Sequence, residues 1–124
     1  MRRSILVVEE DDLARQSVGD ILTALGYRSV DVKSTDVALS ALHGVWFDVV
    51  IVSPQGDDPM GWHVAREAKA LQPHIKVIVV FEGEHAMSTS SPVDGFVKSP
   101  VLPEEIHRVL TAIRPTDSNV TSTP

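Results

Sequence analysis

The feature that most constrains this fold is a series of short apolar runs, most of them followed by a turn and a segment with helical spacing. The runs cover residues 4–8, 28–33, 49–52, 76–81 and 95–99. Short runs rich in β-branched residues are typical of strands, and strands that alternate with helices are typical of a parallel sheet covered on both faces. We therefore predict an α/β fold with five parallel strands and right-handed crossovers.

The segments between these runs predict the helices. Helices are expected from Asp11 or Asp12 to just before Gly26, and over residues 34–44, 61–72 and 103–114. The segment after the fourth run contains Gly83 and four consecutive Ser and Thr residues, which favour turns, so a helix there is expected to be short or absent. The first, third and fourth runs are the most apolar, which predicts the flavodoxin-like strand order 2-1-3-4-5.

Length and charge restrict the class of protein. The chain has 124 residues, a net charge of −6 and no cysteine. We predict one domain over residues 1–114 and a polar, disordered tail over residues 115–124. The acidic balance argues against a nucleic-acid or anionic membrane partner, and no apolar run has the length of a membrane span, so a cytoplasmic protein is expected.

The candidate site lies where the first and third runs end. In an open parallel sheet, function is found at the carboxyl ends of the strands. Glu9 and Glu10 follow the first run, and Ser53 follows the third. Neighbouring strands would bring the carboxylates to the Ser53 loop, where they could hold Mg²⁺ through oxygen ligands. The alternative that the pattern leaves open is a solvated acidic helix start.

Three stretches, residues 6–11, 47–53 with Gly61 beyond, and 95–100, resemble the receiver domain of two-component response regulators. The resemblance runs over nearly the whole predicted domain. In that family a histidine kinase donates a phosphoryl group to an aspartate at the end of the third strand. Magnesium, bound by an acidic pair after the first strand, and a lysine at the end of the fifth strand stabilise the phosphoryl oxygens. The resemblance implies these roles for the matching positions here.

Two of the matching positions carry different chemistry. Glu9 and Glu10 match the acidic pair, which implies at most a weak Mg²⁺ site. Ser53 matches the phosphoacceptor aspartate, and Ser99, which directly precedes a proline, matches the lysine. Lys98 lies one residue earlier, and adjacent strand side chains point to opposite faces, so it is not expected to reach the site. A neutral serine hydroxyl is a poor nucleophile without an adjacent base, and loss of the lysine removes a positive charge that would stabilise the phosphoryl oxygens. Both substitutions therefore act against phosphorylation.

The switch positions of the family are only partly kept. Phe81 or Glu82 stands where a small hydroxyl residue normally closes the fourth strand, and Phe96 matches the aromatic switch position. Trp62, at the start of the third predicted helix, is either a packing residue or an exposed anchor for a partner.

These residues predict a degenerate receiver domain that signals through protein–protein interaction without aspartyl phosphorylation, and that is not an enzyme. Its expected partner is a histidine kinase or another signalling protein, which the sequence does not name, and its oligomeric state is likewise open. One alternative is a receiver that accepts the phosphoryl group on Asp57, Asp58 or a serine. Another is a flavodoxin-like protein that binds a small ligand.

Overall fold

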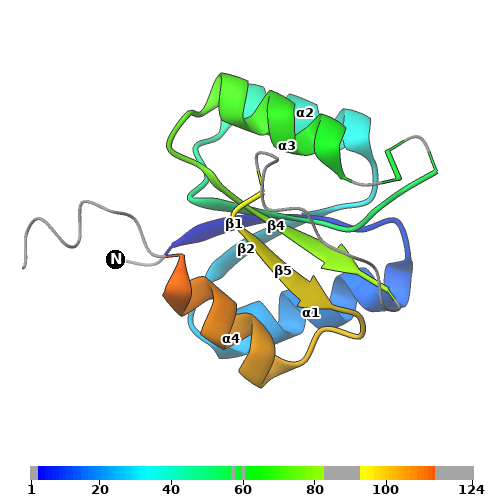
Figure 1. The fold of residues 1–124 in the computed structure, drawn as a ribbon, viewed down its shortest axis with the longest axis vertical. Coiled ribbons are helices and arrows are strands. Elements are labelled where there is room, and N and C mark those ends of the chain that lie inside the picture. The colour runs from blue at the N-terminus through cyan, green and yellow to red at the C-terminus, as the bar shows by residue number, and fades with distance from the viewer. Residues whose placement is uncertain (1–2, 57, 60, 83–92, 114–124) are drawn as a thin grey trace, which may run out of the picture.

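A computed structural model describes residues 3–56, 58–59, 61–82 and 93–113. Within these residues, strands and helices alternate along most of the chain (Figure 1). The elements, in chain order, are β1 (Ser4–Val8), α1 (Asp12–Ala24), β2 (Arg28–Val32), α2 (Thr35–Gly44), β3 (Val49–Val52), α3 (Trp62–Leu71), β4 (Lys76–Phe81), β5 (Gly95–Lys98) and α4 (Pro103–Ala112).

The strands form one parallel sheet in the order β2-β1-β3-β4-β5. This confirms the predicted fold class and strand order. The more polar β2 lies at one edge, whereas the almost wholly apolar β1, β3 and β4 lie in the middle, as expected for strands that are buried on both faces.

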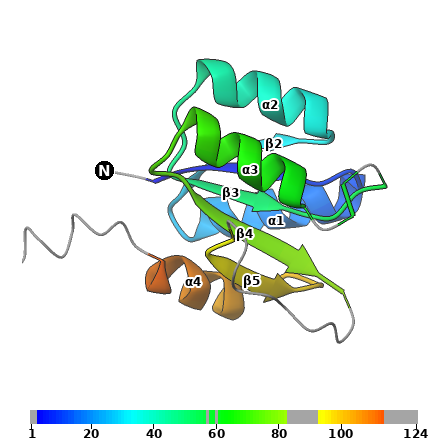
Figure 2. The ribbon, with the colours of Figure 1, turned by 45° about the horizontal axis from the view of Figure 1, so that its top comes forward.

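Two apolar layers fix the helices to the sheet. Helices α2 and α3 cover one face and α1 and α4 cover the other (Figures 1 and 2). Alternate residues of β1, β3, β4 and β5 enter opposite layers: in β3, Val50 and Val52 pack toward α2 and α3, whereas Val49 and Ile51 pack toward α1 and α4. This alternation determines which strand-end side chains share a side of the sheet.

Local sequence explains where the helices begin. The Asp11 carboxylate accepts a hydrogen bond from the Ala14 N–H at 2.8 Å, and the Ser34 hydroxyl accepts one from the Val37 N–H at 3.2 Å. Gly61 precedes α3 with φ of 71°, in the left-handed region that glycine tolerates. A Cβ at Gly61 would also lie 3.1 Å from the Val52 side chain, so the close approach of this turn to β3 requires glycine.

A buried amide ties the opposite, amino end of the sheet to its helices. The side chain of Gln72, directly after α3, accepts from the Phe47 N–H at 2.9 Å and donates to the carbonyls of Leu42 at 2.9 Å and Val45 at 2.6 Å. Nearby, the exposed Trp46 ring stacks on His74 with 3.6 Å between ring centroids. These contacts hold the connection between α2 and β3 against the end of α3.

Two predictions fall outside the described residues: the short or absent helix between β4 and β5, which concerns residues 83–92, and the disordered tail over residues 115–124. None of the described helices combines the length and the apolar character that a membrane crossing requires.

Candidate functional site

The carboxyl ends of β1 and β3 lie side by side, as the sequence predicts. Val8 pairs with Val52, and the Ser53 N–H continues this ladder by donating to the Val8 carbonyl at 2.9 Å. On the other side of β1, the Glu9 N–H donates to the Val32 carbonyl at 3.0 Å. Glu9 and Ser53 are therefore neighbours at the carboxyl end of the sheet, which we call the strand-end edge, with Ser53 buried and Glu9 half-buried.

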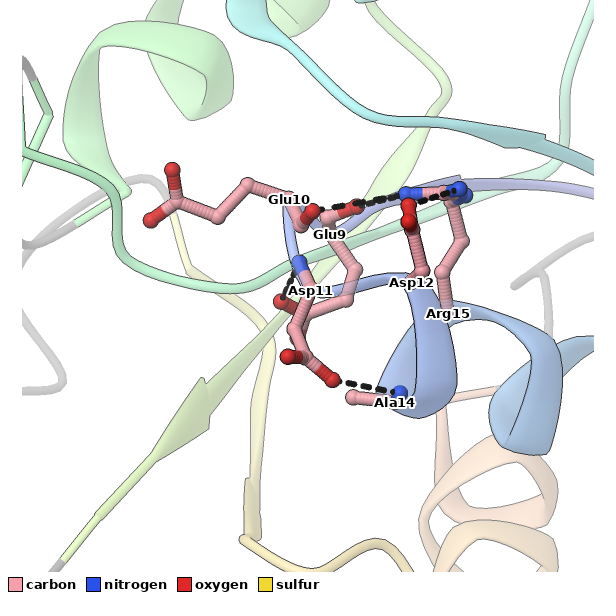
Figure 3. Close-up of polar contacts among 6 residues, drawn as sticks. All are labelled: Glu9, Glu10, Asp11, Asp12, Ala14 and Arg15. Carbon is pink, nitrogen blue, oxygen red and sulfur yellow. Dashed lines mark hydrogen bonds and ion pairs between the residues drawn. The ribbon is translucent and has the colours of Figure 1, made fainter.

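The acidic residues after β1 form a turn whose carboxylates are largely committed to the protein itself (Figure 3). The Glu9 carboxylate accepts from the Asp11 N–H at 2.9 Å, and Asp11 in turn caps α1. Asp12 pairs with Arg15. The Glu10 side chain extends away from the other three carboxylates (Figure 3). The turn is thus a capped helix start in which three of the four carboxylates accept hydrogen bonds from groups of the protein itself.

Arg15 is the central cation of this turn. One of its terminal nitrogens, Nη1, donates to the Glu9 carbonyl at 3.0 Å and, at 3.5 Å, to the Glu10 carbonyl. The other, Nη2, donates to the Asp12 carboxylate at 2.7 Å. The sequence reasoning missed Arg15, although its position one helical turn into α1 was a usable signal, because residues three and four apart share a helix face.

The donor set does not fit the magnesium ion that the receiver resemblance implies. Mg²⁺ requires converging oxygen ligands in near-octahedral geometry. Here the Glu9 carboxylate is turned onto a backbone N–H, Glu10 points elsewhere, and Ser53 contributes no charge. Across the residues that the structure describes, no three His, Cys, Asp or Glu side chains are grouped so as to hold a metal ion.

The ends of β4 and β5 determine which residue takes the lysine position. Val97 pairs with Val80, and both pack into the layer beneath α1 and α4, whereas Phe96 packs against the layer beneath α2 and α3. By this alternation the exposed Lys98 lies on the same side of the sheet as Phe96, and Ser99 lies on the same side as Val97. The Ser99 N–H extends the ladder by donating to the Phe81 carbonyl at 2.8 Å, and the Ser99–Pro100 peptide bond is cis.

The same alternation places the other strand-end residues. Val7 and Ile51 lie in the layer beneath α1 and α4, and Glu9 and Ser53 follow them by two residues. Glu9, Ser53 and Ser99 therefore continue the same side of three strands, and Lys98 does not. Chemically, this side presents one carboxylate and two neutral hydroxyls.

The loop after Ser53 is organised by Asp58. This residue is only 6% exposed, and its two carboxylate oxygens accept from the His63 N–H at 3.0 Å and the Val64 N–H at 3.2 Å. Its backbone also pairs with that of Gln55, a buried residue whose side-chain Nε2 has no hydrogen-bond partner among the described residues. Asp58 thus caps α3 from outside the helix. Asp57, the other proposed acceptor in this loop, lies outside the described residues.

The remaining candidates surround this edge. Phe81 ends β4 one residue beyond the level of Ser53, is half-buried and is followed by the exposed Glu82. Phe96 and Trp62 are both half-buried and pack against the layer beneath α2 and α3. Trp62 therefore has a packing role and also keeps an exposed part; its proposed role as a partner anchor stays a prediction.

Comparison with known proteins gives the fold a family context. No protein-family model matches the chain. A cyclic di-GMP phosphodiesterase of Thermotoga maritima is 28% identical over 102 residues, which cover 79% of this chain and 27% of the relative. The chain therefore spans about a quarter of the length of this curated relative.

Solved structures of similar fold are receiver domains. A CheY-like response regulator receiver domain protein from Methanospirillum hungatei superposes with a TM-score of 0.80 at 21% identity, over 90% of this chain and 93% of that one. The receiver domain of a sensor histidine kinase from Pseudomonas aeruginosa, solved with magnesium in its active-site cleft, gives a TM-score of 0.76 at 18% identity, over 90% and 97% of the two chains. At these identities the likeness shows the fold alone: this chain has the CheY-like receiver fold.

Proposed function

We propose that this chain is a receiver-like signalling domain that binds a protein partner and is not phosphorylated at the strand-end position. It is a binding module, not an enzyme. The observation that carries the proposal is the alternation of β1, β3 and β5, which brings Glu9, Ser53 and Ser99 to one side of the sheet and leaves Lys98 on the other. Phosphoryl transfer at this edge would lack both a carboxylate nucleophile and a lysine counter-charge.

The expected partner is a histidine kinase or another signalling protein. Two comparisons support this class: a receiver domain of similar fold belongs to a sensor histidine kinase, and the curated relative is a cyclic di-GMP phosphodiesterase much longer than this chain. Both comparisons support a signalling partner for this chain.

A working phosphoacceptor at Asp58 is less well supported. The carboxylate is buried and both of its oxygens already accept hydrogen bonds from the start of α3. Phosphorylation there would remove the α3 cap and would require a buried group to reach an external donor. Within the described part of the chain no observation favours a small-ligand site of the flavodoxin type, which would be revealed by a ligand that remains bound through purification.

The test is phosphorylation by acetyl phosphate of four proteins: the wild type, Ser53→Asp, Ser99→Lys and the double variant, followed by intact mass. We expect no label on the wild type and little on either single variant. The double variant should be labelled about tenfold or more above Ser53→Asp, because nucleophile and counter-charge act together.

Two matched controls separate the site from a general charge effect. Ser17→Asp places a carboxylate on the exposed surface of α1, and Thr111→Lys places an ammonium group on the exposed surface of α4. Neither should gain label. Phosphorylation of the wild-type chain would contradict the proposal, and equal labelling of wild type and double variant would show that Ser53 and Ser99 do not form the site.

A further inference from the structure

The part of the chain that forms β2 and α2 exposes an unusual share of large apolar side chains. Of the six large apolar residues that are exposed in the described part of the chain, four lie between residues 30 and 46. They are Val30 in β2, Val37 in α2, and Val45 and Trp46 directly after α2. Figure 2 shows β2 and α2 together along one side of the molecule. Single exposed apolar residues are ordinary, whereas several on one side are typical of a binding surface.

Two of these residues border the outer edge of the sheet on its α2 side. Val30 pairs with Leu6 of β1, which packs into the layer beneath α2 and α3, so Val30 lies on the same side of the sheet. In α2, Val37 and Ala41 are four residues apart and share one flank of the helix. Because Val37 is 47% exposed, this flank is not the one that α3 covers. It therefore lies on the outer side of α2, toward β2.

The backbone of β2 also has groups that point away from the sheet. Among the described residues, β2 pairs with β1 alone. The Arg28 N–H donates to the Arg3 carbonyl at 3.0 Å, and the Val32 carbonyl accepts at 3.0 Å from the residue after β1. Because successive residues of a strand direct their N–H and C=O groups to opposite sides, those of Ser29 and Asp31 point outward. An exposed row of such groups is a template for a further strand.

We propose that β2 pairs antiparallel with β2 of a second copy of this chain, about a two-fold axis that passes between the two Val30 residues. Centred there, the pairing includes all five residues of β2, and the outward groups of Ser29 meet those of Asp31 from the second copy. The two Val30 side chains form a non-hydrogen-bonded pair, in which opposite side chains approach most closely. The exposed flanks of the two α2 helices lie on the same side of the joined sheet and border this contact.

The charges of β2 favour this register and a second copy as the occupant. A two-fold pairing centred on Asp31 would place the two Asp31 carboxylates directly opposite each other, where like charges are destabilising. In the register centred on Val30, Asp31 faces the Ser29 hydroxyl, which is a hydrogen-bond donor. Lys33, which follows β2, lies opposite Tyr27 of the second copy, just after the end of α1. That helix has no basic residue in its last turn, and a cation stabilises a helix C-terminus.

The contact is separate from the strand-end edge and does not depend on the receiver interpretation. Antiparallel β2 strands direct the carboxyl ends of the two sheets in opposite directions, so the strand-end edge of each copy stays uncovered. The dimer would therefore present two such edges, one at each end.

The test is analytical ultracentrifugation of the full chain from about 5 to 500 µM, with a dissociation constant of about 10–100 µM expected for a contact of modest size. Val30→Lys and Val30→Glu each place like charges opposite each other, so each variant alone should be monomeric over this range. An equimolar mixture of the two should form a heterodimer, because the opposed charges then differ in sign. Circular dichroism checks that both variants fold, as expected for a residue that is 45% exposed.

Leu102→Lys and Leu102→Glu are the matched controls, since Leu102 is an exposed apolar residue before α4, which packs beside β5 at the other edge of the sheet. Both should associate like the wild type. A wild type that stays monomeric at about 500 µM would overturn the proposal and would leave β2 to a strand of a different protein. A dimer that the Val30 variants do not weaken, or a mixture of the two that stays monomeric, would exclude the proposed register.

A second measurement tests the backbone pairing in the unchanged protein. Amide hydrogen exchange of Ser29 and Asp31 should slow about threefold or more between about 5 and 500 µM, because their outward N–H groups become bonded in the dimer. Equal exchange rates at the two concentrations, in a chain that does associate, would show that the copies meet elsewhere and would overturn the strand pairing.

Discussion

Removal of the Asp58 carboxylate is expected to destabilise the chain by loosening the start of α3. The residue before this helix, Gly61, has no side chain to cap it, and Asp58 satisfies the N–H groups of His63 and Val64 instead. These belong to the first turn of the helix, whose N–H groups have no partner within the helix. Asp58→Ala leaves both N–H groups without the carboxylate that accepts from them. Because Val64 is buried, leaving its N–H unpaired is costly.

The magnitude follows from these two hydrogen bonds. Loss of a helix N-cap typically costs about 1 kcal/mol, and hydrogen bonds to a charged group contribute about 1.5–3 kcal/mol each. We therefore expect Asp58→Ala to lower the free energy of unfolding by about 2–4 kcal/mol, which corresponds to a fall of about 8–16 °C in the unfolding midpoint of a domain of this size. Asp58→Asn keeps one acceptor oxygen and should lose about half as much.

The assay is urea unfolding followed by far-UV circular dichroism, with acetyl-phosphate labelling of the same proteins. Asp36→Ala is the matched control, because Asp36 lies exposed in the first turn of α2 while Ser34 provides that cap. A loss below about 0.5 kcal/mol for Asp58→Ala would refute the capping role. If the wild type were labelled and Asp58→Asn were not, while both remained folded, Asp58 would be a phosphoacceptor.

Two further stability changes follow from single contacts. Partial burial raises the pKa of Asp31 above its ordinary value of 3.8, an effect that the Ser29 hydrogen bond and the Arg15 charge reduce and that Asp20 increases. Because the folded state disfavours the ionised form, Asp31 costs stability above its raised pKa and costs none below the unfolded value. Asp31→Asn should therefore raise the unfolding midpoint at pH 7, with the gain disappearing at about pH 3; a gain that persists at pH 3 would contradict this cause. Gln72→Ala removes three hydrogen bonds at the amino end of the sheet and should lower the midpoint by about 12 °C, against no change for the exposed Gln16→Ala; an equal midpoint for the two variants would show that the amide contributes little.

The sheet was predictable because its signals are local and repeated. The β-branched runs that become β1, β3 and β4 are apolar on both faces, and only central parallel strands require that pattern. Their order follows once the polar β2 is assigned to an edge. The helix boundaries were equally accessible where a cap or glycine marks them, as at Asp11, Ser34 and Gly61.

The contacts within the site were less predictable because they depend on side-chain direction. The acidic run suggested converging metal ligands, but Glu9 turns back onto the Asp11 N–H and Arg15 reaches the turn from the helix. Likewise, Asp58 carries the same charge as its neighbour Asp57 in the sequence, and only the fold shows that it caps α3. Composition identifies the charges of a loop, whereas the direction of each carboxylate depends on the backbone donors that surround it.

Lys98 shows how strongly the position of a charge depends on strand geometry. Lys98 lies one residue before Ser99, the position that the resemblance assigns to the lysine. The chain therefore keeps a lysine close to the expected position in the sequence. On a strand, however, one residue reverses the side of the sheet. Val97 enters the layer beneath α1 and α4 with Ile51, so the residue on the Ser53 side is Ser99, and Lys98 is exposed on the other side. Bringing Lys98 to the Ser53 side would require Val97 and Phe96 to exchange layers, with Val97 beneath α2 and α3 and Phe96 beneath α1 and α4. Because a change of side-chain volume in a packed layer typically costs about 1–3 kcal/mol, the core opposes that shift, and the neutral strand end is a consequence of the packing of β5 as much as of the loss of two charged residues.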